Sequence, residues 1–159
     1  MERKSIRRRG FDYRLPGPYF VTLVSAQRLP RFGVVCRGRV VLTEAGQIVA
    51  TRWLTIRSID PDVWLDEFIV MPDHFHAIVG LQGGSMGVPS APPGRFVRPA
   101  RSLGSLIAQF KATTTRLINQ SIEGNRRPVW QRNYYERIIR NQPELERIRR
   151  YIITNPKRP

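Results

Sequence analysis

Short runs of β-branched and aromatic residues predict the strands of this chain. The first run lies between Pro18 and Pro30, which is typical of a strand bounded by turn residues. A three-residue turn, Met71–Asp73, joins two further runs and predicts an antiparallel hairpin. The predicted strands are Tyr19–Val24, Val63–Val70, His74–Leu81 and part of Val129–Ile139, with shorter extended pieces at Val34–Cys36 and Val40–Val41 around Gly38.

Apolar residues at helical spacing predict three helices. In Thr43–Ser58 the apolar positions are Ala45, Ile48, Val49, Trp53 and Ile56. The second helix begins at Ser102, a suitable N-cap, and ends near 125–128; its stripe is Leu103, Leu106, Ile107, Phe110, Leu117 and Ile118. Asn141, with Glu144 three residues later, resembles a capping box that opens a last helix. We expect this helix to reach Asn155 and Pro156 to stop it.

The order of these elements predicts the fold class. Strand, helix, two strands, helix and strand form the βαββαβ order of a ferredoxin-like α+β fold, a four-stranded antiparallel sheet with helices on one face, here followed by a C-terminal helix. The length predicts one domain over 1–159. Residues 1–15 form a basic arm, and 82–100 form a loop rich in Gly and Pro. This plan hosts many functions and does not decide the activity.

The net charge of the chain is the strongest indication of its partner. It has 27 Lys and Arg against 12 Asp and Glu, a net charge of +15, and 24 of the cations are arginines. Arginine suits phosphate and stacks on bases, so a nucleic acid is the expected partner. A GC-rich genome would explain Arg in place of Lys but not the net charge. The candidate contacts of the arm are Arg3, Lys4, Arg7, Arg8 and Arg9.

Other features of the composition exclude several classes of protein. No apolar run approaches the roughly 18 residues of a membrane span, so we expect no membrane partner. Cys36 is the single cysteine, which excludes an internal disulfide and a cysteine-based zinc site. These features favour a cytoplasmic location, associated with the nucleoid if DNA is the partner.

The two histidines of the chain, His74 and His76, lie two residues apart in one predicted strand, so both imidazoles share a face. Two neutral imidazoles aimed at one volume can bind a divalent cation. The alternative is a pair of polar residues on a solvated face. A third ligand must come from a carboxylate, an amide or a substrate phosphate, and we expect Asp73 to point away if it belongs to the same strand.

Tyr151 and Asn155 are four residues apart on the last predicted helix and share a face. The alternative is a boundary tyrosine and a helix-terminal amide with no further role.

Taken together, these features resemble a known family. The block Val70–His76, the Trp-Gln block Val129–Glu136 and the segment Tyr151–Pro156 follow a first strand at Tyr19–Thr22 in the order typical of the REP-associated tyrosine transposases. These belong to the single-tyrosine HUH (IS200-like) transposases, whose fold is the ferredoxin-like plan predicted above. The Gly/Pro loop is long for this family, and many relatives continue past the Asn-Pro segment.

The resemblance implies a metal-dependent enzyme that cleaves single-stranded DNA, with or without a hairpin, and transfers the strand through a 5′-phosphotyrosine. Tyr151 would be the nucleophile, with Tyr134 and Tyr135 as alternatives. His74, His76 and Asn155 would hold Mg²⁺ or Mn²⁺. Arg147 and Arg150 flank Tyr151, and Arg132 lies in the Trp-Gln block, so all three are candidate DNA contacts. The protein would act as a monomer or a homodimer.

Two other functions remain open. The first is a non-catalytic ferredoxin-like protein that binds single-stranded nucleic acid through arginines and aromatic platforms. The second is a metal-dependent phosphoesterase that activates water.

Overall fold

The computed structural model describes residues 16–82, 102–122 and 126–157. Its main sheet contains β1 (Gly17–Val24), β4 (Val63–Val70), β5 (His74–Leu81) and β6 (Tyr135–Ile138). The strand order is β4-β5-β1-β6, and every pair is antiparallel. The predicted four-stranded antiparallel sheet and its ferredoxin-like order are thus confirmed.

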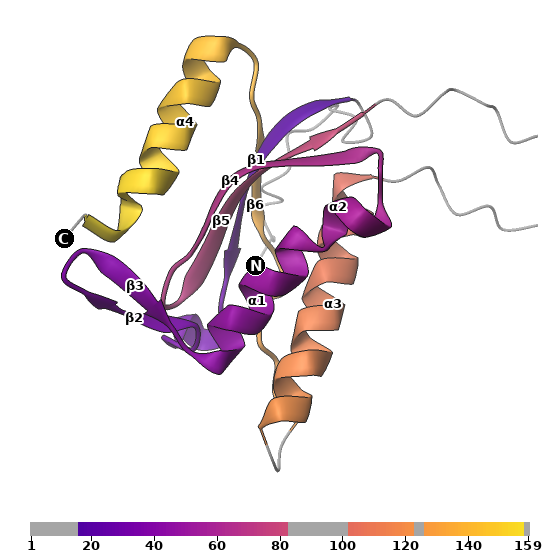
Figure 1. Cartoon of the computed structure of the whole chain (residues 1–159). Coiled ribbons are helices and arrows are strands. Elements are labelled where there is room, and N and C mark those ends of the chain that lie inside the picture. The colour runs from indigo at the N-terminus through magenta and orange to yellow at the C-terminus, as the bar shows by residue number, and fades with distance from the viewer. Residues whose placement is uncertain (1–15, 83–101, 123–125, 158–159) are drawn as a thin grey trace, which may run out of the picture.

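Helices cover both faces of this sheet (Figure 1). Helices α1 (Glu44–Leu54), α2 (Ile56–Ile59) and α3 (Leu103–Ser121) lie on one side, and α4 (Gln142–Thr154) lies on the other. The 3₁₀ turn η2 (Asn155–Lys157) follows α4 directly. None of the described helices is long and apolar enough to span a membrane.

The alternation of side chains along each strand produces two separate cores. On the α1 and α3 face, buried residues such as Leu23, Phe75 and Ala77 pack against Trp53 and Phe110. On the α4 face a smaller core joins Ile78 and Ile139 to residues of α4. The members of this smaller core are Ile78, Ile139, Ile148 and Ile152, with Phe20, Trp64, Ile69, Leu145 and Tyr151 partly buried against it.

The ends of the helices follow their sequence signals, with two corrections. The side chain of Ser102 caps α3 in a capping box with Ser105, and Thr43 caps α1. The prediction of one helix over 43–58 is wrong, because α1 ends at Leu54 and Thr55 separates it from α2. The α-helical part of α4 ends at Thr154, and the chain continues through Pro156 as a 3₁₀ turn. Proline fits there because its fixed φ is compatible with a helical turn.

The shorter predicted strands form a ribbon of their own. Strands β2 (Gly33–Cys36) and β3 (Arg39–Leu42) pair as an antiparallel hairpin, preceded by the 3₁₀ turn η1 (Ala26–Arg28). Arg37 and Gly38 both have positive φ in the tight turn between them. A two-residue turn of this kind matches the twist of the strands it joins.

The Trp-Gln block anchors the segment that leads into β6. Trp130 is buried, and its Nε1 donates to Thr114 Oγ1 of α3 at 2.9 Å. The ammonium group of Lys111, also on α3, donates to the carbonyl oxygens of Gln131 at 2.6 Å and Arg132 at 3.0 Å. These contacts fix where β6 begins.

The predicted basic arm and nearly all of the Gly/Pro loop lie outside the described residues. The arm covers residues 1–15, and of the loop only Gln82 is described.

A close approach of two backbones at Gly46 supplies a test of this packing. An added Cβ would lie 1.9 Å from the carbonyl oxygen of Phe32, a backbone atom with little freedom to move. We expect Gly46→Ala to lower the free energy of unfolding by about 1–3 kcal/mol through this overlap, although alanine favours helix more than glycine. Denaturant unfolding measures the change, and Gln47→Ala on the exposed side of α1 is the control. Unchanged stability of Gly46→Ala would contradict the described contact.

Candidate active site on the α4 face

Both histidines lie on the face of β5 that α4 covers. Phe75 and Ala77 point into the larger core, so His74 and His76 point to the opposite side. Their ring centroids are 4.6 Å apart at an interplanar angle of 71°. The structure therefore brings the two imidazoles together on one face of a central strand.

A neighbouring oxygen contacts the Nδ1 atom of each imidazole. Thr22 Oγ1 on β1 lies 2.7 Å from His76 Nδ1, because Thr22 is directly opposite His76 in the β1–β5 register. Asp73 Oδ1 lies 2.7 Å from His74 Nδ1. The expectation that Asp73 points away applied only if it belonged to the strand, and Asp73 belongs instead to the turn before β5, where strand alternation does not apply. When both Nδ1 atoms donate, each Nε2 carries the lone pair.

Tyr151 approaches the histidine pair from α4. Its phenolic oxygen lies 3.4 Å from His76 Nε2, a long contact by hydrogen-bond standards. Phe20 stacks on the His76 ring with centroids 5.4 Å apart and meets the Tyr151 ring edge-on at 6.1 Å. Two strands and one helix thus converge on a single cluster of Phe20, His76 and Tyr151.

The environment keeps His76 in its neutral form. Its pKa is lowered to about 3, mainly by burial and also by the nearby His74, while Asp73 opposes these effects. A neutral imidazole retains the lone pair that a metal ion or a phenolic proton requires.

Asn155 lies at the C-terminal end of α4, as its C-cap residue. Its side chain is buried, and it follows the inward-facing Ile152 by three residues. Among the residues that the structure describes, no three His, Cys, Asp or Glu side chains gather as a metal site. Asn155, the predicted amide ligand, lies one turn beyond Tyr151.

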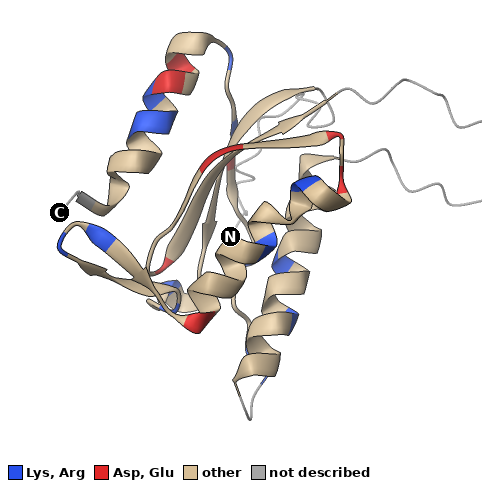
Figure 2. Cartoon of the chain, in the orientation of Figure 1, with Lys and Arg blue, Asp and Glu red and all other residues tan. Residues whose placement is uncertain are grey.

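Arginines surround the entrance to Tyr151. A pocket of about 630 Å³ between α4 and the sheet is lined by Phe20, Arg137, Arg147, Arg150 and Tyr151, among others. Figure 2 shows acidic residues near the N-terminal end of α4 and basic residues further along the helix.

One of those acidic residues, Glu144, organises part of this surface. Its carboxylate accepts the backbone N–H of Arg140 at 2.9 Å and pairs with the guanidinium of Arg137. Arg147 lies 3.8 Å from the same carboxylate. The backbone N–H of Arg140 is the main cause of a lowered pKa at Glu144, and the three arginine charges lower it further while burial opposes them.

The other predicted site residues fall elsewhere or outside the described chain. Arg132 is exposed in the segment that Lys111 holds against α3. Tyr134 packs against the larger core, whereas Tyr135 is 49% exposed and faces Thr22 across the β1–β6 pair. The five basic residues of the arm, Arg3, Lys4, Arg7, Arg8 and Arg9, lie outside the described residues.

Sequence reasoning missed several residues of this site. Thr22, Phe20 and Arg137 all belong to predicted strands, and their alternation is visible in the sequence. Their contacts depend on which strands are neighbours and in what register, which no single strand specifies.

Comparison with known proteins places this arrangement in a structural class. The chain has the fold of a REP-associated tyrosine transposase whose structure was solved bound to a REP hairpin. The TM-score is 0.61 at 19% identity, over 95% of this chain and 72% of that one. A protein of Deinococcus radiodurans R1 provisionally assigned as a transposase has a TM-score of 0.53 at 15% identity, over 94% of this chain and 96% of that one. The resemblance inferred from the sequence is confirmed at the level of the fold.

The chain belongs to the same family as an uncharacterized protein of Haemophilus influenzae. The two are 33% identical over 162 residues, which cover 97% of this chain and 88% of that protein. No established family model matches the sequence.

The lowered pKa of Glu144 predicts an acid-dependent term in stability. A carboxyl whose pKa is lower in the folded state contributes stability above its ordinary pKa, and this is lost as pH falls through the folded value. We therefore expect the stability difference between wild type and Glu144→Gln to be largest above about pH 4.5 and to shrink at lower pH. Thermal unfolding of both proteins from pH 7 to pH 3 measures this. A difference independent of pH would contradict an ionised Glu144.

Proposed function

We propose that the protein is a metal-dependent transposase-like enzyme that cleaves and rejoins single-stranded DNA, with Tyr151 as its nucleophile. The main support is the 3.4 Å contact between the Tyr151 phenol and His76 Nε2. It brings a nucleophile and a candidate metal ligand, 75 residues apart in the chain, to one point beside a basic pocket. The solved neighbour bound to a REP hairpin supports a substrate that includes hairpin DNA.

The residues present fit a divalent cation. His74 and His76 would bind it through Nε2, since both Nδ1 atoms are engaged by Asp73 and Thr22. Such outer oxygens orient imidazole ligands in many metal sites. Asn155 would supply an amide oxygen. Two nitrogens and one oxygen suit Mn²⁺ more than Mg²⁺, although a phosphate oxygen of the substrate would suit both. When bound, the cation supplies a Lewis acid that offsets the charge of the reacting phosphate.

The reaction proceeds by a single displacement at phosphorus. The Tyr151 oxygen forms a new bond to the phosphorus of the scissile phosphodiester, and the bond from phosphorus to the 3′-oxygen breaks. The phenol loses one proton and the leaving 3′-oxygen gains one. A 5′-phosphotyrosine and a free 3′-hydroxyl result, and attack by another 3′-hydroxyl reverses the step. The ester preserves the energy of the phosphodiester, so rejoining needs no nucleotide cofactor.

The residues of this chain would accelerate the attack mainly by holding Tyr151, His76 and the DNA phosphates in place. Phe20 limits the movement of both the His76 ring and the Tyr151 ring through its two aromatic contacts. Arg147 and Arg150 line the pocket beside the nucleophile, where they would hold phosphates that flank the scissile one. A nucleophile held in place before substrate binds saves much of the entropic cost of attack.

The first prediction concerns the nucleophile. Tyr151→Phe removes one oxygen and should abolish the covalent protein–DNA adduct while DNA affinity and folding persist. Denaturing gel electrophoresis of labelled single-stranded DNA incubated with protein and Mn²⁺ detects the adduct, and peptide mapping locates it.

Tyr135→Phe is the matched control, since Tyr135 is an exposed tyrosine on the same face of the sheet. It should retain the adduct. A phosphotyrosine at Tyr135 would overturn the assignment but not the enzyme class. DNA binding by wild-type protein without any adduct would favour the non-catalytic binding protein, and cleavage by Tyr151→Phe would favour water as the nucleophile.

The second prediction concerns the metal. We expect His74→Ala and His76→Ala each to abolish Mn²⁺ binding and adduct formation. Thr22→Val keeps the shape of the side chain and removes the hydroxyl beside His76 Nδ1, so Mn²⁺ affinity should fall about 10–100-fold. Calorimetric titration with Mn²⁺ measures these changes. Thr51→Val, at an exposed position of α1, is the control, and equal affinities of Thr22→Val and wild type would refute the role of Thr22.

The third prediction concerns the DNA contacts. Each single-strand phosphate contact contributes about 0.7 to the slope of log affinity against log salt. Arg147→Ala and Arg150→Ala should each lower that slope by roughly this amount. Arg116→Ala, on α3 across the sheet, should leave it unchanged. Fluorescence anisotropy with a labelled oligonucleotide over a salt series measures the slope. Equal slopes for all variants would show that Arg147 and Arg150 do not contact DNA phosphates.

A further inference from the structure

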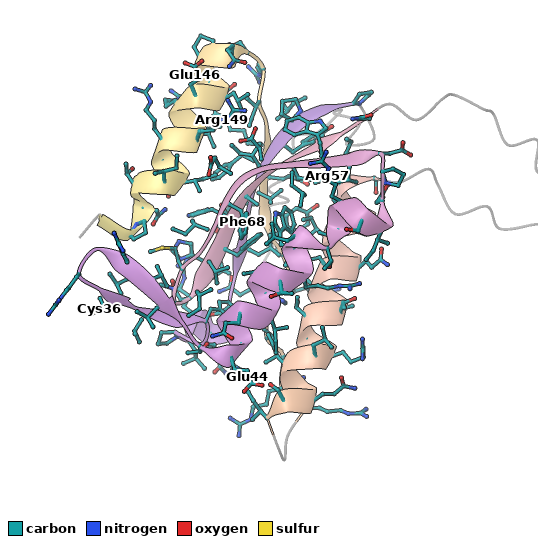
Figure 3. The ribbon with its side chains drawn as sticks, viewed as in Figure 1. Cys36, Glu44, Arg57, Phe68, Glu146 and Arg149 are labelled. Carbon is teal, nitrogen blue, oxygen red and sulfur yellow. The ribbon has the colours of Figure 1, made fainter. Side chains whose placement is uncertain are left out.

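A bidentate ion pair attaches α4 to β4, the edge strand of the sheet. Arg149 Nε donates to Asp66 Oδ1 at 2.8 Å, and Arg149 Nη2 donates to Asp66 Oδ2 at 2.5 Å. The Asp66 side chain is 11% exposed. Arg149 lies between α4 and the sheet (Figure 3). The hydrogen bond from Arg149 is the main cause of the lowered pKa of Asp66.

An irregularity in β4 points Asp66 toward α4. Leu65 pairs with Val79 and Phe68 pairs with Ala77, so β4 uses one residue more than β5 over this interval. This is a β-bulge. Leu65 and Phe68 both pack on the larger core, while Asp66 faces the opposite side and Glu67 is exposed. Without the extra residue, an odd spacing such as that between Leu65 and Phe68 would place the two on opposite faces.

The connection from β6 to α4 is short and held at both ends. It comprises Ile139, Arg140 and Asn141. Ile139 is buried, and its N–H donates to the carbonyl oxygen of Pro18 at 2.9 Å. Glu144 accepts the N–H of Arg140, and the Asn141 side chain accepts that of Glu144. These contacts hold α4 against the sheet of its own chain.

Arg149 and Tyr151 lie on opposite flanks of α4. Ile148 and Ile152 face the sheet. At 100° per residue, Arg149 lies about 80° to one side of that direction and Tyr151 about 80° to the other. A roll of α4 by about 20° would move a side-chain tip some 6 Å from the axis by about 2 Å. The Asp66 contact resists that roll, and a misplacement of about 1 Å can cost a factor of 100 in rate.

We propose that Asp66 and Arg149 are positioning residues that set the roll of α4 and so deliver Tyr151 to His76 of the same chain. This inference rests on the proposed function for its kinetic consequence. The bulge in β4 includes Asp66, whose carboxylate accepts both hydrogen bonds from Arg149. The active site is then complete within one chain.

The kinetic experiment measures single-turnover adduct formation at saturating single-stranded DNA with Mn²⁺. Asp66→Asn and Arg149→Lys should each slow the rate constant about 10- to 100-fold, while the final amount of adduct stays near the wild-type level. The double variant should be no slower than the slower single variant, because both remove one interaction. A purely structural role would reduce the amount of adduct, or the melting temperature, without this change in rate constant.

Matched controls are Glu67→Gln, beside Asp66 on the same bulge, and Arg116→Lys on α3. Both should react at the wild-type rate. Rate constants of Asp66→Asn and Arg149→Lys within twofold of wild type would overturn the proposal.

A mixing experiment tests whether the site forms within one chain. His76→Ala lacks the ligand and Tyr151→Phe lacks the nucleophile, so a mixture yields adduct only if one chain supplies Tyr151 to the histidines of another. We expect no adduct from the mixture at any ratio. Adduct formation would overturn assembly within one chain.

A spectroscopic readout separates this proposal from the proposed function. With 3-fluorotyrosine incorporated, the fluorine resonance that His76→Ala shifts and Tyr151→Phe removes belongs to Tyr151. Asp66→Asn should also shift that resonance, and Glu67→Gln should not. If wild-type protein forms no adduct, the proposed function fails, yet this shift still supports the positioning. An unshifted resonance in Asp66→Asn refutes the positioning, whatever the activity.

Discussion

The alternation of side chains along β5 is the constraint on which both the core and the candidate site depend. Phe75 and Ala77 belong to the core beneath α1 and α3, so His74 and His76 must face α4. A slip of one residue would bury both imidazoles in the apolar core and expose its aromatic residues. Pairing with β1 and β4 prevents that slip and also brings Thr22 beside His76. Stability and site geometry are therefore consequences of the same register.

Helix α4 is held by a narrow apolar stripe and by polar contacts on either side of it. Ile148 and Ile152 supply the buried contacts, and Arg149 and Glu144 supply an ion pair and a set of hydrogen bonds. A stripe this narrow allows the helix to roll, because burial of apolar area is not directional. Hydrogen bonds and paired charges are directional, so they determine the orientation that burial alone leaves open.

On the α4 face of the sheet, two acidic residues form ion pairs with arginines. Asp66 receives Arg149, and Glu144 receives Arg137. In a chain with a net charge of +15, like-charge repulsion would otherwise act between neighbouring arginines on α4 and β6. The remaining basic surface beside Tyr151 suits a polyanion, and the same few carboxylates hold the helix that carries Tyr151.

The sequence alone determined the strands, the helix that carries Tyr151, and the sharing of one face by His74 and His76, because these follow from local periodicity. It also predicted the ferredoxin-like order, since connection rules leave few topologies for βαββαβ. It left the direction of Asp73 open, because Asp73 lies in a turn where strand alternation does not apply. Only the tertiary structure decided the contact between Thr22 and His76, the ion pair between Asp66 and Arg149, and the approach of Tyr151 to His76. These are contacts between residues 54 to 83 positions apart, and they depend on strand register and on the roll of a helix, which no local pattern encodes.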